Sequence, residues 1–80
     1  MRFFVLGDVS VDLLYFLDRI PEPGEEIPAH QALLKPGGAG ATLAAQLASL
    51  GHRVYLAGRV GEDAFRPIAL STLEGLGVDL

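Results

Sequence analysis

A short glycine-rich run, Pro36-Gly37-Gly38-Ala39-Gly40, is the segment of this sequence best suited to bind a small polar ligand. It opens a stretch rich in alanine and leucine, which predicts a helix from Gly40 onward. Glycines let the backbone approach a ligand closely, and the N–H groups of a helix's first turn, helped by the helix dipole, favour oxygen atoms. The run therefore predicts a binding site for an oxygen-rich small molecule.

Two phosphate-binding motifs and a structural turn compete with this interpretation. A dinucleotide fingerprint needs a strand directly before the run, a third glycine, and an acidic residue about 20 positions later. Here Lys35-Pro36 precedes the run, Leu43 stands in place of the third glycine, and the acidic pair Glu62-Asp63 is better explained as a helix cap. A Walker-type loop needs a lysine and a hydroxyl residue after its last glycine, and the sequence has no such triplet. Taken alone, the run would also suit a purely structural glycine turn.

Asp12 is the second candidate ligand-binding residue, at the end of the series Gly7-Asp8-Val9-Ser10-Val11-Asp12. An ionised aspartate accepts two hydroxyl protons, and charge-assisted hydrogen bonds are roughly twice as strong as neutral ones. A site that pairs hydroxyl groups also rejects analogues that lack them. Considered alone, Asp12 would be assigned as a solvated turn residue, so its role depends on the motifs around it.

The elements that would position these residues alternate between strand and helix. Apolar runs at 3–6 and 54–57 predict strands buried in a parallel sheet, and each is followed by a glycine. A helix is predicted from Gly40 to Gly51, and a second after the cap Glu62-Asp63. Residues 78–80 resemble the start of another strand. This order is typical of right-handed βαβ units, so the predicted fold class is α/β.

Apolar stripes and two further strands complete the predicted elements. The stripes are Leu43, Ala44, Leu47 and Leu50 in the first helix, and Phe65, Ile68, Ala69, Thr72, Leu73 and Leu76 in the second. Short strands are predicted at 12–18 and at about 26–34, outside the main sheet, with a turn of prolines and glycine between them.

The bulk composition limits the classes of partner. Half of the 80 residues are apolar, more than so small a chain easily buries, so we expect it to oligomerise or to belong to a larger body. The net charge is −4 and the six basic residues are scattered, which argues against nucleic acid. No apolar run approaches the roughly 20 residues of a membrane span. Cysteine is absent, and we expect a cytoplasmic protein without disulfides or structural zinc.

Four motifs occur in one order, and together they resemble the N-terminal part of the ribokinase-like, or PfkB, carbohydrate kinases. They are Gly7 to Asp12, Pro21 to Glu25, Pro36 to Thr42, and Gly58 to Phe65. The resemblance covers essentially the whole chain and rests on the ordered set. It implies a three-layer α/β sandwich with a mostly parallel sheet, of which residues 1–80 form the N-terminal part of one kinase domain. A small β lid at about 12–35 would be inserted after the first strand, and the end at Leu80 is expected to be a truncation.

The resemblance implies ATP-dependent phosphorylation of a sugar or a related small polyhydroxylated substrate. It also implies ATP and Mg²⁺ as cofactors, bound mainly by residues beyond this chain. The implied substrate-binding residues are Ser10, Asp12, Gly37, Gly38 and Thr42. No catalytic base and no metal ligand is expected in this segment, because the catalytic aspartate of the family lies far downstream. A non-catalytic sugar- or nucleoside-binding homologue is the alternative.

Some positions depart from the family pattern. Thr42 stands where asparagine is usual, Ala39 stands where a lysine or another polar residue is frequent, and Arg66-Pro67 replaces a glycine after Phe65. These changes leave ribose unassigned as the substrate and suggest the non-catalytic alternative.

The remaining polar residues are predicted to have structural or surface roles. Asp8 would form a strand-end turn and Asp63 a helix cap, and the solvated surface groups would be Glu25, Glu26, His30 and His52. Exposed-edge strands carrying Leu14, Phe16 and Ile27 predict a homodimer formed through the lid.

Overall fold

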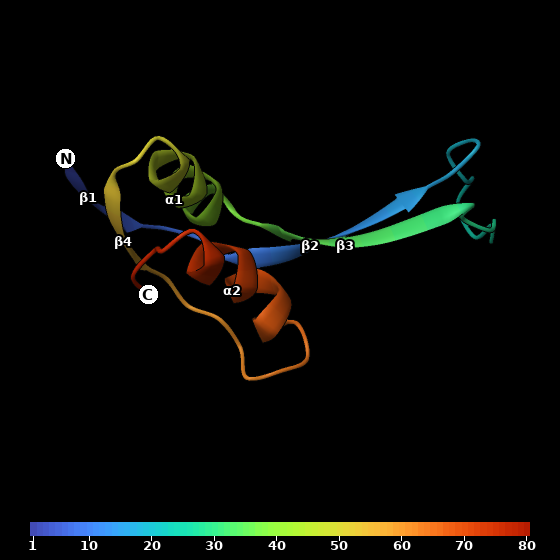
Figure 1. Ribbon diagram of the computed structural model, residues 1–80. Coiled ribbons are helices and arrows are strands. Elements are labelled where there is room, and N and C mark those ends of the chain that lie inside the picture. The colour runs from blue at the N-terminus through green and yellow to red at the C-terminus, as the bar shows by residue number, and fades with distance from the viewer.

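The computed structural model describes all residues from 1 to 80. In chain order the elements are β1 (Arg2–Leu6), β2 (Ser10–Phe16), β3 (Gln31–Gly37), α1 (Ala39–Ser49), β4 (Arg53–Ala57) and α2 (Arg66–Gly75). Figure 1 shows two parts: a body of β1, β4 and both helices, and a hairpin of β2 and β3 that projects from it. Neither helix has the length and hydropathy that a membrane-spanning segment requires.

The sheet of the body is parallel. β1 pairs with β4 in a register that sets Arg2 opposite Arg53 and Leu6 opposite Ala57. Beyond α2, the chain adds one parallel bridge from Asp79 to Tyr55, in which the Asp79 N–H donates to the Val54 carbonyl at 2.9 Å. The predicted βαβ order and the start of a third strand are confirmed, and the fold class is α/β.

The core lies between the sheet and the two helices. It consists of Val5, Ala41, Ala44, Val54, Leu56, Leu73 and Val78, all buried. Alternate side chains of a strand project to opposite faces, so the residues between these core positions lie on the other face of the sheet. There Phe4 and Leu6 are 73% and 80% exposed. Within residues 1–80, helices therefore cover one face of the sheet.

The buried residues of the helices agree with the predicted apolar stripes only in part. α1 buries Gly40, Ala41 and Ala44, whereas Leu43 and Leu50 are 47% and 73% exposed. The small side chains let the helix approach the sheet closely, which rotates the larger leucines outward. In α2 the buried residues are Ala69 and Leu73, as the predicted stripe requires, whereas the stripe members Phe65 and Leu76 flank the helix and are 50% and 40% exposed.

The hairpin strands begin and end at other residues than predicted. They are antiparallel and run over 10–16 and 31–37 instead of 12–18 and 26–34, with Ser10 opposite Gly37 and Phe16 opposite Gln31. Pro28 has no N–H and lies outside the ladder, which excludes the predicted early start of β3. Pro36 is accommodated because each strand of a two-stranded hairpin has one free edge. As a result, β3 continues into the glycine run.

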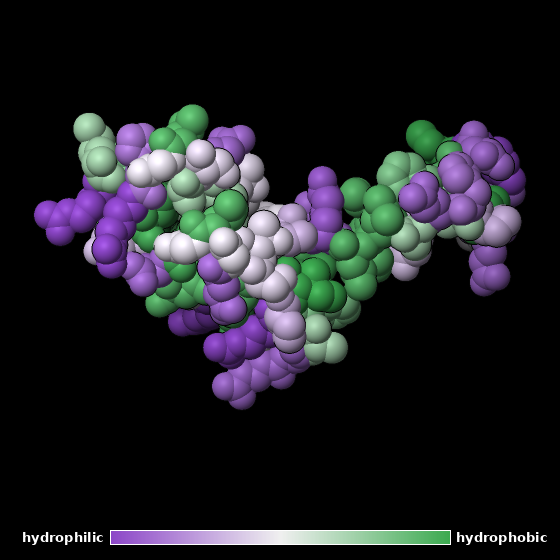
Figure 2. Space-filling model, in the orientation of Figure 1, coloured by the Kyte–Doolittle hydropathy of each residue, from purple (hydrophilic) through white to green (hydrophobic).

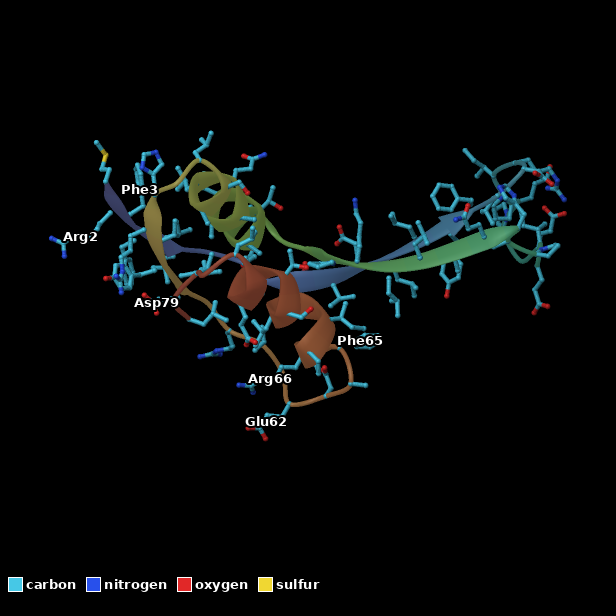
Figure 3. The ribbon with its side chains drawn as sticks, in the orientation of Figure 1. Arg2, Phe3, Glu62, Phe65, Arg66 and Asp79 are labelled. Carbon is cyan, nitrogen blue, oxygen red and sulfur yellow. The ribbon has the colours of Figure 1, made fainter.

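The start of α2 also corrects a predicted cap. The Asp63 Oδ1 accepts the Phe65 N–H at 2.9 Å, but Phe65 itself is the N-cap and no side chain caps the helix. Asp63 therefore stabilises the turn before α2. Pro67 lies in the first turn of α2, where the backbone N–H that proline lacks would have no partner within the helix. Figure 3 shows Glu62, Phe65 and Arg66 around this end of the helix.

Three residues predicted to be freely solvated have partners. Near the hairpin tip, both Glu25 carboxylate oxygens accept hydrogen bonds from Arg19, at 2.6 and 2.5 Å. This pairing lowers the pKa of Glu25 and raises the pKa of Arg19. The His30 Nδ1 lies 3.4 Å from the Asp18 carboxylate. His52 packs edge-on against Phe3, with ring centroids 5.0 Å apart.

Candidate functional site

Asp12 and Gly37 are the closest pair among the residues that the sequence indicates. A Cβ built at Gly37 would lie 2.6 Å from the Asp12 Oδ1 and 2.7 Å from the Oδ2. The Asp12 carboxylate therefore lies over the bare backbone of Gly37, where any larger residue would displace it. Asp12 is exposed and Gly37 is buried. The glycine thus provides the space in which the carboxylate is held.

Gly38 forms the connection between β3 and α1. Its φ of 95° is in the region that favours glycine, and a Cβ there would lie 2.5 Å from the Asp8 carbonyl oxygen. No side chain caps α1, and the Gly38 N–H has no acceptor among residues 1–80. Since the first turn of a helix presents free N–H groups, this end of α1 offers donors to a ligand oxygen.

Gly40 has a different task from Gly37 and Gly38. A Cβ at Gly40 would lie 2.7 Å from the carbonyl carbon of Gly7, and one at Gly58 would lie 2.7 Å from the Gly7 carbonyl oxygen. Next to this contact, the Ala41 N–H donates to the Asp8 carbonyl at 3.1 Å. These backbone contacts, which we call the glycine joint (Gly7, Gly40 and Gly58), fix the start of α1 against the ends of β1 and β4. Asp8 contributes through its backbone, as predicted for a structural residue.

Thr42 and Ser10 lie on either side of this arrangement. Thr42 lines a cavity of about 310 Å³ together with Lys35, Gly37 and Gln46. Ser10, opposite Gly37 in the hairpin register, lines a second cavity of about 390 Å³ between the hairpin and the start of α2. The structure thus brings Asp12, Gly37 and Gly38 together, sets Thr42 in the adjoining cavity, and places Ser10 at the border of another.

Two polar residues of the first cavity were not identified from the sequence, namely Lys35 and Gln46. Gln46 lies one helical turn after Thr42, so the helical period alone would have placed both on one face of α1. Lys35 lies two positions before Gly37 and therefore on its face of the strand. That signal depends on knowing that β3 extends through the glycine run, which the sequence pattern did not show.

Acidic residues do not gather into a metal site within residues 1–80. No group of three or more His, Cys, Asp or Glu side chains lies close enough to hold a metal ion.

Comparison with known proteins identifies the family to which this chain is similar. The model of the "pfkB family carbohydrate kinase" family matches residues 2–80. The chain is 36% identical over 74 residues to a ribokinase of Bacillus subtilis, covering 92% of this chain and 25% of that protein. It is 39% identical over 79 residues to a fructokinase of Escherichia coli, covering 99% and 22%. The chain thus spans about a quarter of the length of these relatives.

A solved structure shares the fold as well as the sequence. Arabidopsis thaliana ribokinase, complexed with ribose and ATP, superposes with a TM-score of 0.85 at 37% identity. The match covers 96% of this chain and 25% of that chain. The ribokinase-like fold predicted from the ordered motifs is therefore confirmed for this part of the molecule.

Proposed function

We propose that this chain, which belongs to the pfkB family of carbohydrate kinases, supplies the acceptor side of a kinase that phosphorylates a sugar or a related polyhydroxylated molecule. The observation that carries the proposal is the Asp12 carboxylate held over Gly37, beside the unpaired N–H of Gly38. An anionic acceptor and a backbone donor at adjacent positions match the two hydrogen-bonding capacities of a hydroxyl group. The ATP dependence comes from the family and from the relative described with ATP.

Each residue has a role in this proposal. Asp12 accepts hydrogen bonds from substrate hydroxyls and orients them. Gly37 leaves room for that carboxylate, and Gly38 donates its N–H to a substrate oxygen. Ser10 and Thr42 add hydroxyl contacts at the two borders of the site. Together they bind and orient the acceptor before transfer, which is a contribution through proximity and orientation.

ATP and Mg²⁺ are assigned to the protein through the family and not to any residue of this segment. Bound ATP would supply the transferred phosphoryl group, with Mg²⁺ neutralising its charge. On the resemblance to the family, we propose that both are bound mainly by residues beyond this segment.

The hairpin is proposed to act as the lid of this kinase domain, corresponding to the segment at about 12–35. It carries exposed apolar side chains on both faces: Leu14 and Phe16, at 36% and 41% exposure, on one, and Leu13 and Tyr15, at 51% and 60%, on the other. We propose that part of this surface pairs with the hairpin of a second copy, giving a homodimer. Sedimentation of the full-length protein tests that arrangement, since a monomer at all concentrations would contradict it.

A non-catalytic binding protein is the second candidate function. Ala39 brings no polar side chain to the start of α1, and Thr42 brings only one hydroxyl group, so the site offers few side-chain contacts to a sugar. Such a protein would bind a sugar or nucleoside through Asp12 and Gly38 without transferring phosphate.

The decisive experiment is a panel of sugars and nucleosides with ATP and Mg²⁺, using the full-length protein and following ADP release. Wild type is expected to turn over at least one of them. Asp12→Asn keeps the size of the side chain but removes its charge, and should raise the KM for the acceptor by about 10- to 100-fold, as expected for loss of a hydrogen bond to a charged group.

Asp18→Asn is the matched control, because Asp18 lies near the hairpin tip with its side chain 95% exposed. It should leave the KM within about two-fold of wild type. Binding without ADP release would favour the non-catalytic protein, and equal effects of the two substitutions would contradict the role of Asp12.

A further inference from the structure

Lys35 is the one charged residue of β3, and it lies directly opposite Asp12 in the hairpin. Opposite residues of an antiparallel pair project on the same face, with Cα atoms about 4.5–5.5 Å apart. Gly37, two positions further along β3, lies on that face too. The acceptor side of the hairpin therefore carries an ammonium group next to a carboxylate.

These two charges do not pair with each other. The Asp12 carboxylate leans along the strands to lie over Gly37, with both oxygens within 2.7 Å of the position of a Cβ there. The four ion pairs of residues 1–80 involve arginines and a histidine, and Lys35 takes part in none of them. Lys35 is also exposed. Its positive charge is therefore free to meet a ligand.

Lys35 is the one charged side chain that lines the adjoining cavity, and the Asp12 carboxylate lies at its border, over Gly37. Its polar lining side chains are Lys35, Thr42, Gln46 and Thr72, and none of the ten acidic residues of the chain lines it. Its volume of about 310 Å³ is in the range of small-molecule sites.

We infer that Lys35 binds an anionic group of the acceptor, so that the preferred substrate is a sugar acid or a sugar phosphate. The inference rests on the proposed function and narrows its substrate class. Two residues along a strand span about 6.6–6.8 Å, which is comparable with the length of a small sugar. Hydroxyl groups at one end would meet Asp12 and Gly38, while a carboxylate or phosphate at the other end meets Lys35. A lysine ammonium acts as a point charge and serves either anion.

A lysine on an exposed strand can also serve only to prevent edge-to-edge association. Calorimetric titration of the full-length protein separates the two roles by comparing matched probes: gluconate with glucose, and ribose 1-phosphate with ribose. Lys35→Gln should weaken the binding of an anionic probe by about ten-fold or more, the loss expected for a charged hydrogen bond. The neutral probe of the pair should change by less than about two-fold.

Two further variants make the result specific. Lys35→Arg keeps the charge and should retain most of the affinity for the anionic probe. Arg2→Gln removes one positive charge at the end of the body remote from the hairpin, as Figure 3 shows, and should change no affinity. If Lys35→Gln weakens the binding of gluconate, the preferred acceptor is a sugar acid; if it weakens the binding of ribose 1-phosphate, the preferred acceptor is a sugar phosphate.

Several outcomes would overturn the inference. They are equal affinities of wild type and Lys35→Gln for every probe, an equal loss for charged and neutral probes, and tighter binding of neutral sugars by wild type. The last would leave the proposed kinase function intact if the neutral sugar is phosphorylated. Failure of wild type to bind or phosphorylate any acceptor would instead remove both the function and the inference.

Discussion

The body and the hairpin differ in how they are stabilised. The body buries side chains from both of its strands and both of its helices in one core. In the hairpin, Gly37 is the single buried residue, and its large apolar side chains are exposed. Figure 2 shows this as a band of hydrophobic surface along the hairpin, ending in a hydrophilic tip. A two-stranded hairpin alone is marginally stable in water, so this one depends on its attachment to the body.

The difference separates the residues that maintain the fold from those available for binding. Substitutions in the body act on packing, whereas substitutions in the hairpin act on surfaces that are free in this chain. The hairpin can therefore change its exposed side chains at a lower cost in stability than the body can change its core.

The largest expected effect concerns the core of the body. Leu73 is 2% exposed, and Leu73→Ala should lower the free energy of unfolding by about 2–5 kcal/mol, because the substitution leaves a cavity in the core. Leu33 in the hairpin is 43% exposed, and Leu33→Ala should lower the free energy of unfolding by less than about 1 kcal/mol. Urea unfolding of the full-length protein measures both. Equal losses would contradict the contrast and show that another surface covers Leu33.

The next effect distinguishes the two adjacent glycines at the base of the hairpin. Gly38→Ala places a Cβ against the Asp8 carbonyl at a φ of 95°, and should lower the unfolding free energy by about 1–3 kcal/mol. Gly37→Ala meets only the Asp12 side chain, which can turn away.

Gly37→Ala should therefore weaken acceptor binding far more than it changes stability. Thermal unfolding and calorimetric titration, performed on both variants, compare the two effects. An equal loss of stability in the two variants would show that Gly37 is also required by the backbone.

The smallest effect is expected at the hairpin tip, as a function of pH. The hydrogen bonds from Arg19 lower the pKa of Glu25 below its reference of 4.5. Their contribution is therefore present above that reference and is lost as the pH falls through the lowered pKa of Glu25. The raised pKa of Arg19 has no effect in the same range, because its contribution is lost only in strong alkali. Both groups are exposed, so the change should stay local.

Amide hydrogen exchange across the tip, followed from pH 6 down to about pH 3, measures this change. The Glu22 N–H donates to the Glu25 carboxylate at 2.9 Å. As the pH falls, the exchange rate of this amide should decrease less than the exchange rates of other amides do, because the hydrogen bond that protects it is lost. Glu25→Gln should remove the pH-dependent part. A loss of protection throughout the body over the same range would contradict a local effect.

The sequence predicted the body better than the hairpin. Val5, Val54 and Leu56 lie in short apolar runs that end at glycines, and such runs have few alternatives to a buried strand. The predicted stripe of α1 was right for Ala44 and Leu47, which lie in or against the core, and wrong for Leu43 and Leu50, which are exposed. Helix periodicity shows which residues share a face, but the closeness of the sheet decided that the alanine face is buried.

The predicted bounds of the hairpin strands were wrong for a different reason. Nearly every side chain of β2 and β3 is exposed, so no contrast between a buried and a solvated face marked where the strands begin. The sequence nevertheless drew attention to Asp12 and the glycine run through the ordered motifs around them, and the structure brings Asp12 next to Gly37. Lys35 was missed because its importance comes from the strand opposite it.

The hairpin projects from the body like an arm, and its base lies next to the glycine joint. At about 3.4 Å per residue, its seven-residue strands reach roughly 24 Å, so a rotation of about 5° at the base displaces the far end by about 2 Å. Asp12 and Gly37 lie near the pivot and hardly move in such a rotation, whereas Arg19 and Glu25 travel furthest. Positional accuracy therefore decreases along the arm: the contacts that need fixed geometry lie at its base, and those that tolerate displacement lie at its end.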